Sequence, residues 1–392
     1  MVSQSEAVAA VRSYRDANGA SIIAEFVDLL ALPNVSRHLD DVATVADRIA
    51  GMLSQRGAAV RVETLPGAAP LVVGRLEVPG AKQTIGIYAH YDGQPIDQPD
   101  WSTEPFKPTL VDAPLEAGGQ EIPFPHHDDA INPEWRIYAR STSDDKAPIM
   151  AVCAALDGMA AAGLAPSSNV VFLFEGEEEI GSLHLADYMK RLRDDLSADV
   201  WLICDGPVHQ TRVPQVVFGV RGISEMEVTA YGPVRPLHSG HYGNWARNPN
   251  LELARLLASM KSDDGTVLVE GFDDSTQPIT DSDRAAVAAL PNDDTALRLE
   301  LGLGDLEGAG EALALRLLRP SLNVRGFDGG AVGEAAANVI PTRARASIDI
   351  RLAAGNDPVR MMAVSYTHLT LPTKVLVCRS GGARGAVGGG GG

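Results

Sequence analysis

The stretch Asn169–Glu179 reads NVVFLFEGEEE, an apolar run that ends directly in a group of glutamates. Two other stretches have the same plan: Thr84–Asp92, TIGIYAHYD, and Asp199–Asp205, DVWLICD. Short apolar runs are typical of buried strands, and the carboxyl ends of parallel strands gather functional groups at one edge of a sheet. We therefore expect the three run-ends to converge. A histidine among carboxylates is a typical ligand set for divalent cations.

The composition of the chain argues against several classes of function. Its 392 residues include 51 acidic and 33 basic ones, and the net charge of −18 disfavours nucleic-acid and anionic-membrane partners. The three cysteines form no C-x-x-C pair, so a reducing, cytoplasmic location is expected rather than a disulfide framework. No apolar run approaches the roughly 18 residues of a membrane span, and the N-terminal pattern is helical rather than that of a signal peptide.

The first two hundred residues have the periodicity of an α/β domain. Strand-like apolar runs alternate with helical patterns, among them amphipathic helices expected over residues 42–56 and 148–162. This alternation is typical of a sheet covered by helices. We assign residues 1–210 to this domain.

Residues 211–364 are interpreted as a second domain, because their pattern changes. Strands are expected over residues 216–219 and 225–231, and strict alternation over 344–352 predicts a half-buried strand. Residues 262–294 are polar and are expected to be rich in loops.

The segment Ser365–Thr373, SYTHLTLPT, is similar to the translation of a transposase adapter used in sequencing libraries. The residues after it end in a run of glycines and have no core-forming pattern. We expect residues 365–392 to be an unstructured tail derived from an adapter. The natural protein is expected to continue in a different sequence from this point.

The candidate ligands also have ordinary structural interpretations when each is taken alone. Asp92 can orient His90 by accepting the proton of its second ring nitrogen, but a single H-x-D triplet also occurs by chance. Asp144 and Asp145 precede a helix, where aspartates often act as caps. The run Glu177–Glu179 is harder to explain, because adjacent carboxylates at a buried strand end repel each other unless a cation or proton lies among them.

Together these motifs resemble those of the two-zinc aminoacyl dipeptidase and deacylase family, which includes carnosine dipeptidase, acetylornithine deacetylase, succinyl-diaminopimelate desuccinylase and carboxypeptidase G. The shared motifs, in the same order, are HYD at 90–92, SDDK at 143–146, FEGEEEIGS at 174–182, Asp205, and LHSG at 237–240. The resemblance implies a mixed-sheet catalytic domain with helices on both faces. It also implies an inserted α+β lid domain that forms the dimer interface.

The resemblance further implies roles for the matched residues of the first domain. Glu178 would be the general base toward a water that bridges the two metals, and Asp92 would orient the histidine ligand. The peptide bond between the two aspartates of SDDK would be cis. The expected ligands of two Zn²⁺ ions, with Co²⁺ or Mn²⁺ as alternatives, are His90, Asp144, which would bridge the ions, Glu179 and Asp205.

In the lid domain, the resemblance implies residues that contact the substrate. His238 would stabilise the oxyanion, commonly in the site of the partner subunit. Asn338 and Arg351 would bind the substrate carboxylate, Arg351 through a bidentate pair. The last ligand of the family is a histidine in a returning C-terminal segment, which this sequence lacks. The second metal is therefore expected to be under-coordinated, and this chain is expected to be inactive.

The combined prediction is a zinc-dependent hydrolase that cleaves the amide bond of dipeptides or N-acyl amino acids. A deacylase or desuccinylase of the same family remains an alternative. From other classes, a mononuclear iron oxygenase would use His90, Asp92 and a distant histidine, and a non-catalytic binding protein would keep the fold without competent metals. The helical patterns between the strands argue against the oxygenase, and the intact Glu178 argues against the binding protein.

Overall fold

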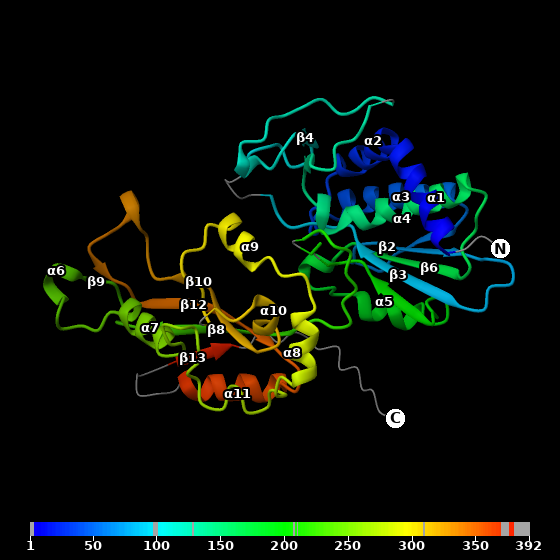
Figure 1. The fold of residues 1–392 in the computed structure, drawn as a ribbon. Coiled ribbons are helices and arrows are strands. Elements are labelled where there is room, and N and C mark those ends of the chain that lie inside the picture. The colour runs from blue at the N-terminus through cyan, green and yellow to red at the C-terminus, as the bar shows by residue number, and fades with distance from the viewer. Residues whose placement is uncertain are drawn as a thin grey trace. The chain divides into compact units, whose positions relative to one another are not determined.

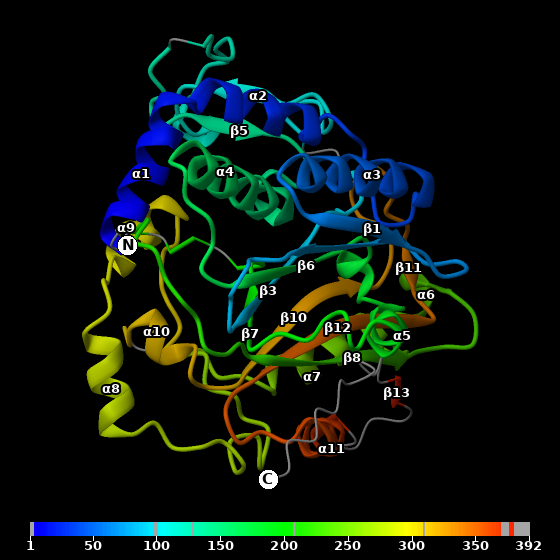
Figure 2. The same cartoon turned by 90° about the vertical axis from the view of Figure 1, so that its right-hand side faces the viewer.

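The computed structural model describes residues 4–96, 101–127, 129–206, 208–209, 211–308, 310–369 and 376–379. The chain divides into two compact units, Met1–Pro207 and Val208–Gly392, whose elements are drawn in Figures 1 and 2. Each unit has its own sheet and its own hydrophobic core. No helix in the described ranges combines the length and the hydrophobicity that crossing a membrane requires.

The first unit is built on a five-stranded sheet with the order β1-β2-β6-β3-β7. Its strands are β1 (Ala59–Glu63), β2 (Leu71–Leu76), β3 (Thr84–His90), β6 (Asn169–Glu175) and β7 (Val200–Ile203). Strands β6, β3 and β7 run parallel, whereas β2 pairs antiparallel with both β1 and β6. The three apolar stretches singled out in the sequence are therefore three adjacent parallel strands of a mixed sheet.

Helices cover both faces of this sheet, with α3 and α4 on one side and α5 on the other (Figures 1 and 2). Side chains of β6 alternate between two cores: Phe172 and Phe174 pack with α3 and α4, whereas Leu173 packs with α5. The predicted α/β mixed-sheet fold is confirmed. The helices are α1 (Gln4–Ala17), α2 (Gly19–Leu30), α3 (Leu39–Gln55), α4 (Ala147–Ala161) and α5 (Leu185–Arg191).

Short elements connect the strands of the first unit. Strands β4 (Thr109–Val111) and β5 (Arg136–Tyr138) pair antiparallel, with the turn η1 (Leu115–Ala117) between them. The turn η2 (Thr142–Lys146) leads into α4, and the turn η3 (Glu178–Ile180) follows β6. Both η2 and η3 carry residues that the sequence assigns to the metal site.

The second unit contains a four-stranded antiparallel sheet with the order β10-β12-β8-β13. Leu253 of α7 and Met361 of α11 pack against Met226 of β8 and Ile348 of β12 in its core. Alternate residues of β12 are buried from Ala344 onward, which confirms the strand predicted over 344–352. The main elements are β8 (Gly222–Tyr231), α7 (Pro249–Ala258), β10 (Ser321–Asp328), β12 (Arg343–Leu352), α11 (Pro358–Leu369) and β13 (Leu376–Arg379).

The second unit also has a set of short elements. A two-stranded sheet joins β9 to β11. The short elements are β9 (Leu237–His238), α6 (Ser239–Tyr242), α8 (Asp281–Ala288), α9 (Asp294–Glu300), α10 (Leu313–Arg316), η4 (Gly333–Ala335) and β11 (Val339–Ile340).

One local prediction in the second unit is wrong. Residues 216–219 form no strand, since β8 begins only at Gly222. Strand propensity is effective only where a neighbouring strand offers a partner, and Phe218 is exposed instead. Residues 262–294 are rich in loops, as predicted, and also contain α8, which begins with a capping box between Thr280 and Asp283.

The structure describes two short pieces of the predicted tail at residues 365–392, and the adapter origin of this tail stays a prediction. Helix α11 continues to Leu369, and β13 pairs antiparallel with β8. Strand pairing is made by main-chain N–H and C=O groups, so a segment without a core-forming pattern can still add to the open edge of a sheet. The rest of this tail lies outside the described residues.

Arg56, at the end of α3, connects three helices of the first unit. Its guanidinium donates hydrogen bonds to Glu25 of α2, Asp157 of α4 and the main-chain carbonyls of Met52 and Cys153. The Arg56 side chain is 8% exposed, and those of Glu25 and Asp157 are 23% and 28% exposed. Without the arginine, two half-buried carboxylates would lose their counter-charge.

We predict that Arg56→Ala lowers the free energy of unfolding by about 2–3 kcal/mol, because it breaks a largely buried charge network. Arg75→Ala is the matched control. It removes an arginine of β2 that pairs with the exposed Glu77, so the expected change is below about 0.5 kcal/mol. Urea denaturation of both variants measures the difference, and equal losses would contradict a stabilising role for Arg56.

Candidate metal centre

The carboxyl ends of the three parallel strands bring a histidine and several carboxylates together. His90 is the last residue of β3, and its register partner at the end of β6 is Glu175. The main-chain N–H of Cys204 donates to the carbonyl of Tyr88, which extends the pairing of β3 with β7. Asp205, the next residue, is thereby held beside His90.

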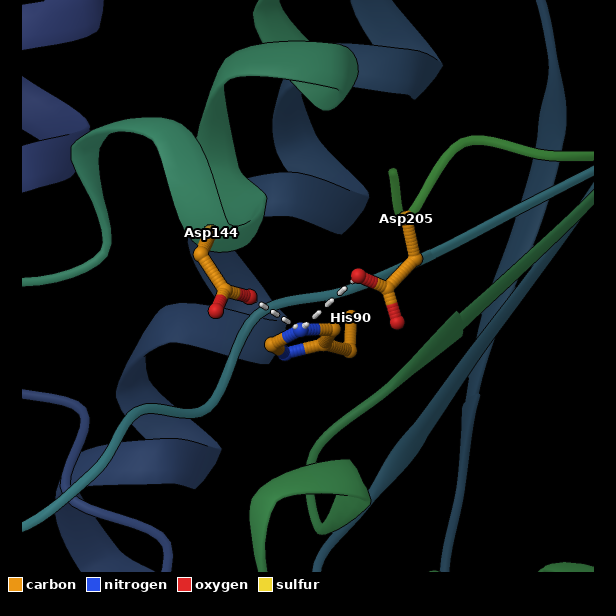
Figure 3. A group of neighbouring side chains, drawn as sticks. All are labelled: His90, Asp144 and Asp205. Carbon is orange, nitrogen blue, oxygen red and sulfur yellow. Dashed lines mark hydrogen bonds and ion pairs between the residues drawn. The ribbon is translucent and has the colours of Figure 1, made fainter. Parts of the chain in front are cut away.

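Asp144 and Asp205 both point toward the ring of His90 (Figure 3). Oδ1 of Asp144 lies 2.8 Å from Nε2 of His90, and Oδ1 of Asp205 lies 3.9 Å from the same nitrogen. One ligand atom from each of these residues lies within 4.8 Å of the others. Ligand atoms of one zinc ion are roughly 3–4 Å apart, because each is about 2 Å from the ion. The spacing therefore suits a shared divalent cation.

The buried Asp92 connects His90 to the glutamate turn η3. Its Oδ1 lies 3.3 Å from Nδ1 of His90. Its two carboxylate oxygens also accept hydrogen bonds from the main-chain N–H groups of Glu178 and Glu179, each at 3.1 Å. Asp92 therefore positions the two glutamates through their main-chain N–H groups, and its role in orienting the histidine ring stays a prediction.

The two adjacent aspartates of η2 have different surroundings. Oδ2 of the buried Asp145 accepts a hydrogen bond from the main-chain N–H of His90 at 3.1 Å. The side chain of Asp144 is 67% exposed and reaches the imidazole ring of His90 instead. The peptide bond between the two aspartates is cis, as the resemblance implied.

The carboxylates around His90 create a strongly negative field. Burial alone would lower the pKa of His90, but the interaction with Asp92 and the charges of Asp145 and Asp205 raise it to about 10. Burial raises the pKa of Asp145 to about 7. A positive charge at Nε2 of His90 is thus strongly favoured. A divalent cation beside this nitrogen would meet the same field, so the residues fit such an ion.

Glu178 and Glu179 lie next to the group of three. Oε2 of Glu178 is 4.0 Å from Nε2 of His90, and burial raises the pKa of Glu178. Oε2 of Glu179 accepts a hydrogen bond from Gln94 at 2.6 Å. Burial also raises the pKa of Glu179, and the charge of Asp144 adds to this effect against the hydrogen bond from Gln94. Their predicted roles as base and ligand stay predictions.

The residues predicted to contact the substrate lie in the second unit. Val339, which follows Asn338, is the register partner of His238, so this histidine and this asparagine are neighbours. Arg351 lies on β12, with its Nε 3.3 Å from Oδ2 of Asp349. The roles of the three residues in substrate binding stay predictions.

Two buried groups beside the site have hydrogen-bond partners that the sequence did not predict. Glu175 accepts a hydrogen bond from the hydroxyl of Tyr88 at 2.7 Å, and burial raises its pKa to about 7. The ammonium group of Lys146 donates to the main-chain carbonyls of Leu29 and Leu32, each at 3.0 Å, and burial lowers its pKa to about 7. An acid as the last residue of a buried strand could have indicated Glu175. No pattern distinguishes Lys146 from a surface lysine.

Comparison with known proteins identifies similar enzymes. A sequence model of peptidase family M20/M25/M40 matches residues 86–361. The Cys-Gly metallodipeptidase DUG1 of Saccharomyces cerevisiae is 27% identical over 312 residues, which are 78% of this chain and 61% of the relative. The Beta-Ala-His dipeptidase of Homo sapiens is 28% identical over 291 residues, 72% of this chain and 52% of the relative. The chain thus spans about half to three fifths of these relatives.

Solved structures share the fold. The metallo-carboxypeptidase Sso-CP2 from Sulfolobus solfataricus, of the M20 family, has a TM-score of 0.72 and 28% identity, covering 91% of this chain and 77% of that one. Human carnosine dipeptidase 1 has a TM-score of 0.76 and 23% identity, covering 95% and 79%. At the latter identity the likeness shows a shared fold only.

We predict that Asp92→Asn lowers the affinity for Zn²⁺ about 10- to 100-fold, the usual effect of losing a residue that orients a metal-binding histidine. An amide has one acceptor oxygen, so it cannot keep both main-chain hydrogen bonds and the contact with His90. Titration against a chromophoric zinc chelator measures the affinity. Asp187→Asn, at an exposed residue of α5 paired with Lys190, is the control. Equal affinities in both variants would contradict the positioning role of Asp92.

Proposed function

The chain belongs to peptidase family M20/M25/M40, and from this premise we propose that it is a zinc-dependent hydrolase of dipeptides. The observation that carries the proposal is the group of His90, Asp144 and Asp205, with Glu178 at 4.0 Å from the histidine ring. Imidazole and carboxylate ligands suit Zn²⁺, and Co²⁺ or Mn²⁺ are the alternatives. Glu179 is proposed as a further ligand. Burial and the negative charge of Asp144 raise the pKa of Glu179, and a cation beside both carboxylates would relieve this repulsion.

The residues of the first unit account for the proton transfers of amide hydrolysis. A bound divalent cation would polarise the scissile carbonyl and lower the pKa of water. Glu178 is proposed to take a proton from the attacking water and to pass it to the leaving amine. Burial raises the pKa of its carboxyl group toward neutrality, where a group that both accepts and returns a proton is most effective.

The proposed substrate class rests on the relatives and on residues of the second unit. The two curated relatives are named as dipeptidases for Cys-Gly and for Beta-Ala-His. Arg351 faces Asp349 through its Nε, and its terminal nitrogens can bind a substrate carboxylate. Asn338 would assist this contact, and His238 would stabilise the oxyanion. N-acyl amino acids present the same carboxylate and are the alternative substrates.

We further propose a cytoplasmic homodimer that assembles through the second unit, with His238 acting in the site of the partner subunit. Cys153 and Cys204 are free thiols, which agrees with a reducing compartment. The histidine and aromatic side chains of β9, α6 and the turn after α6 offer a surface suited to such a role: the exposed His238, His241 and Trp245, and the half-buried Tyr242.

We predict that a form extended to the length of the relatives hydrolyses Cys-Gly in the presence of Zn²⁺, whereas the 392-residue chain, expected to lack the last ligand, turns over little. In the extended form Glu178→Gln should lower kcat about 10²- to 10⁴-fold, the usual contribution of a general base. The zinc content of this variant should be unchanged, because a base is not a ligand. Release of free amine and elemental analysis measure the two quantities on the same preparation.

Glu179→Gln is the matched comparison for this test and is expected to lose zinc. Loss of zinc in Glu178→Gln with retention in Glu179→Gln would exchange the two roles. Release of amine from N-acyl amino acids but not from dipeptides would assign a deacylase instead. The zinc comparison distinguishes the two glutamates even where turnover is too slow to measure.

We predict that Arg351→Lys raises KM for dipeptides about 10-fold or more, because an ammonium group cannot replace a planar bidentate guanidinium. KM for the C-terminally amidated dipeptides should change little. Arg345→Lys, on the same face of β12 and paired with Asp328, is the control. If Arg351→Lys raises KM equally for dipeptides and for their amidated forms, Arg351 does not recognise the substrate carboxylate.

A further inference from the structure

A cavity of about 430 Å³ lies in the second unit, lined by residues of α9, α10 and the start of β10. This volume is in the usual range for small-molecule sites. None of the residues proposed for catalysis or substrate binding lines it. Most of its apolar wall is leucine: Leu297, Leu301, Leu303, Leu306, Leu313 and Leu317.

The leucines of this wall remain accessible to solvent. Leu301 is 58% exposed and Leu317 is 43% exposed, although both line the same cavity. Single exposed leucines are ordinary on protein surfaces, whereas several around one hollow are typical of a place where an apolar group binds.

Four arginines and four carboxylates also line this cavity: Arg221, Arg298, Arg316, Arg319, Asp273, Asp294, Glu307 and Glu311. Among the described residues, Arg221 and Arg298 form no ion pair, but Arg298 donates to the main-chain carbonyls of Leu303 and Gly304. Nη1 of Arg221 donates to the hydroxyl of Ser321 at 3.3 Å, and both residues line the cavity. Within the part of the chain that the structure describes, no carboxylate lies within ion-pair distance of Arg221. By contrast, Arg316 and Arg319 both pair with Glu311.

The electrostatic surroundings of Arg221 also favour an added anion. Burial and the positive charge of Arg351 lower the pKa of Arg221, and the smaller effect of the negative charge of Asp349 opposes them only in part. Asp349 is itself shared by Arg351 and by the amide of Asn323. A ligand carboxylate beside Arg221 would supply the missing negative charge and could accept two parallel hydrogen bonds.

We propose that this cavity binds a small amphipathic carboxylate, such as a medium-chain acyl carboxylate. Its carboxylate would pair with Arg221 and Ser321, and its hydrocarbon chain would pack on the leucine wall. A short anion would leave the leucines uncovered, and an uncharged chain would leave Arg221 without a counter-charge, so the two features together select an amphipathic anion. The site lies within the second unit and does not depend on metal binding.

Isothermal titration of the 392-residue chain with octanoate, acetate and 1-octanol tests the proposal. Octanoate should bind at least tenfold more tightly than acetate. Arg221→Gln should weaken octanoate at least tenfold, as expected for the loss of a charge-assisted hydrogen bond, and should leave 1-octanol unchanged. Leu301→Asn should weaken octanoate and 1-octanol alike.

Two further variants keep the outcome decisive. Arg345→Gln, which removes an exposed arginine paired with Asp328, should not change octanoate binding. Ser321→Ala removes one hydroxyl and should weaken octanoate even if Arg221→Gln folds poorly. Absence of octanoate binding to the unaltered chain, or equal binding by Arg221→Gln and the unaltered chain, would overturn the proposal. If Arg351→Gln loses octanoate binding while Arg221→Gln keeps it in full, octanoate binds at the proposed substrate site. This result would also overturn the proposal.

Discussion

The geometry of the first unit depends on the crowding of negative charge at the carboxyl ends of three parallel strands. His90 and Glu175 are register partners, and Asp205 follows the next strand, so pairing of the sheet forces these groups together. Repulsion between like charges is strong where water is excluded. Hydrogen-bond donors offset it, including the hydroxyl of Tyr88 and the main-chain N–H groups of His90 and of the turn η3. These donors belong to the sheet and its turns, so folding and site geometry rest on the same hydrogen bonds.

The same hydrogen bonds decide which carboxylates remain available to a cation. Asp92 and Asp145 are buried, and their oxygens accept main-chain N–H groups. Asp144, Asp205 and Glu178 keep side chains that are 67%, 33% and 37% exposed. A buried carboxylate with its own donors orients its neighbours, whereas a carboxylate with free oxygens at the rim can bind a metal or move a proton. The division follows from burial and not from residue type.

Sequence patterns predicted β3, β6 and β7 well, because a buried parallel strand is a continuous apolar run and its end is marked by the first polar residue. They could not separate Asp144 from Asp145, since two identical neighbours differ only in which side chain turns inward. The buried Lys146 faces main-chain carbonyls that no spacing reveals. Residues 216–219 have strand composition but no partner strand, and the pairing of β13 with β8 is made by main-chain groups. Prediction therefore failed where the outcome depended on distant partners.

The two units leave charge of opposite sign without a partner. In the first unit, carboxylates outnumber the cationic groups around His90, and the field favours an added positive charge. In the second unit, Asp349 is shared by Arg351 and Asn323, and Arg221 has the positive charge of Arg351 nearby without a carboxylate of its own. Each unit is thus suited to a ligand of the sign that it lacks, a divalent cation in the first and a carboxylate in the second.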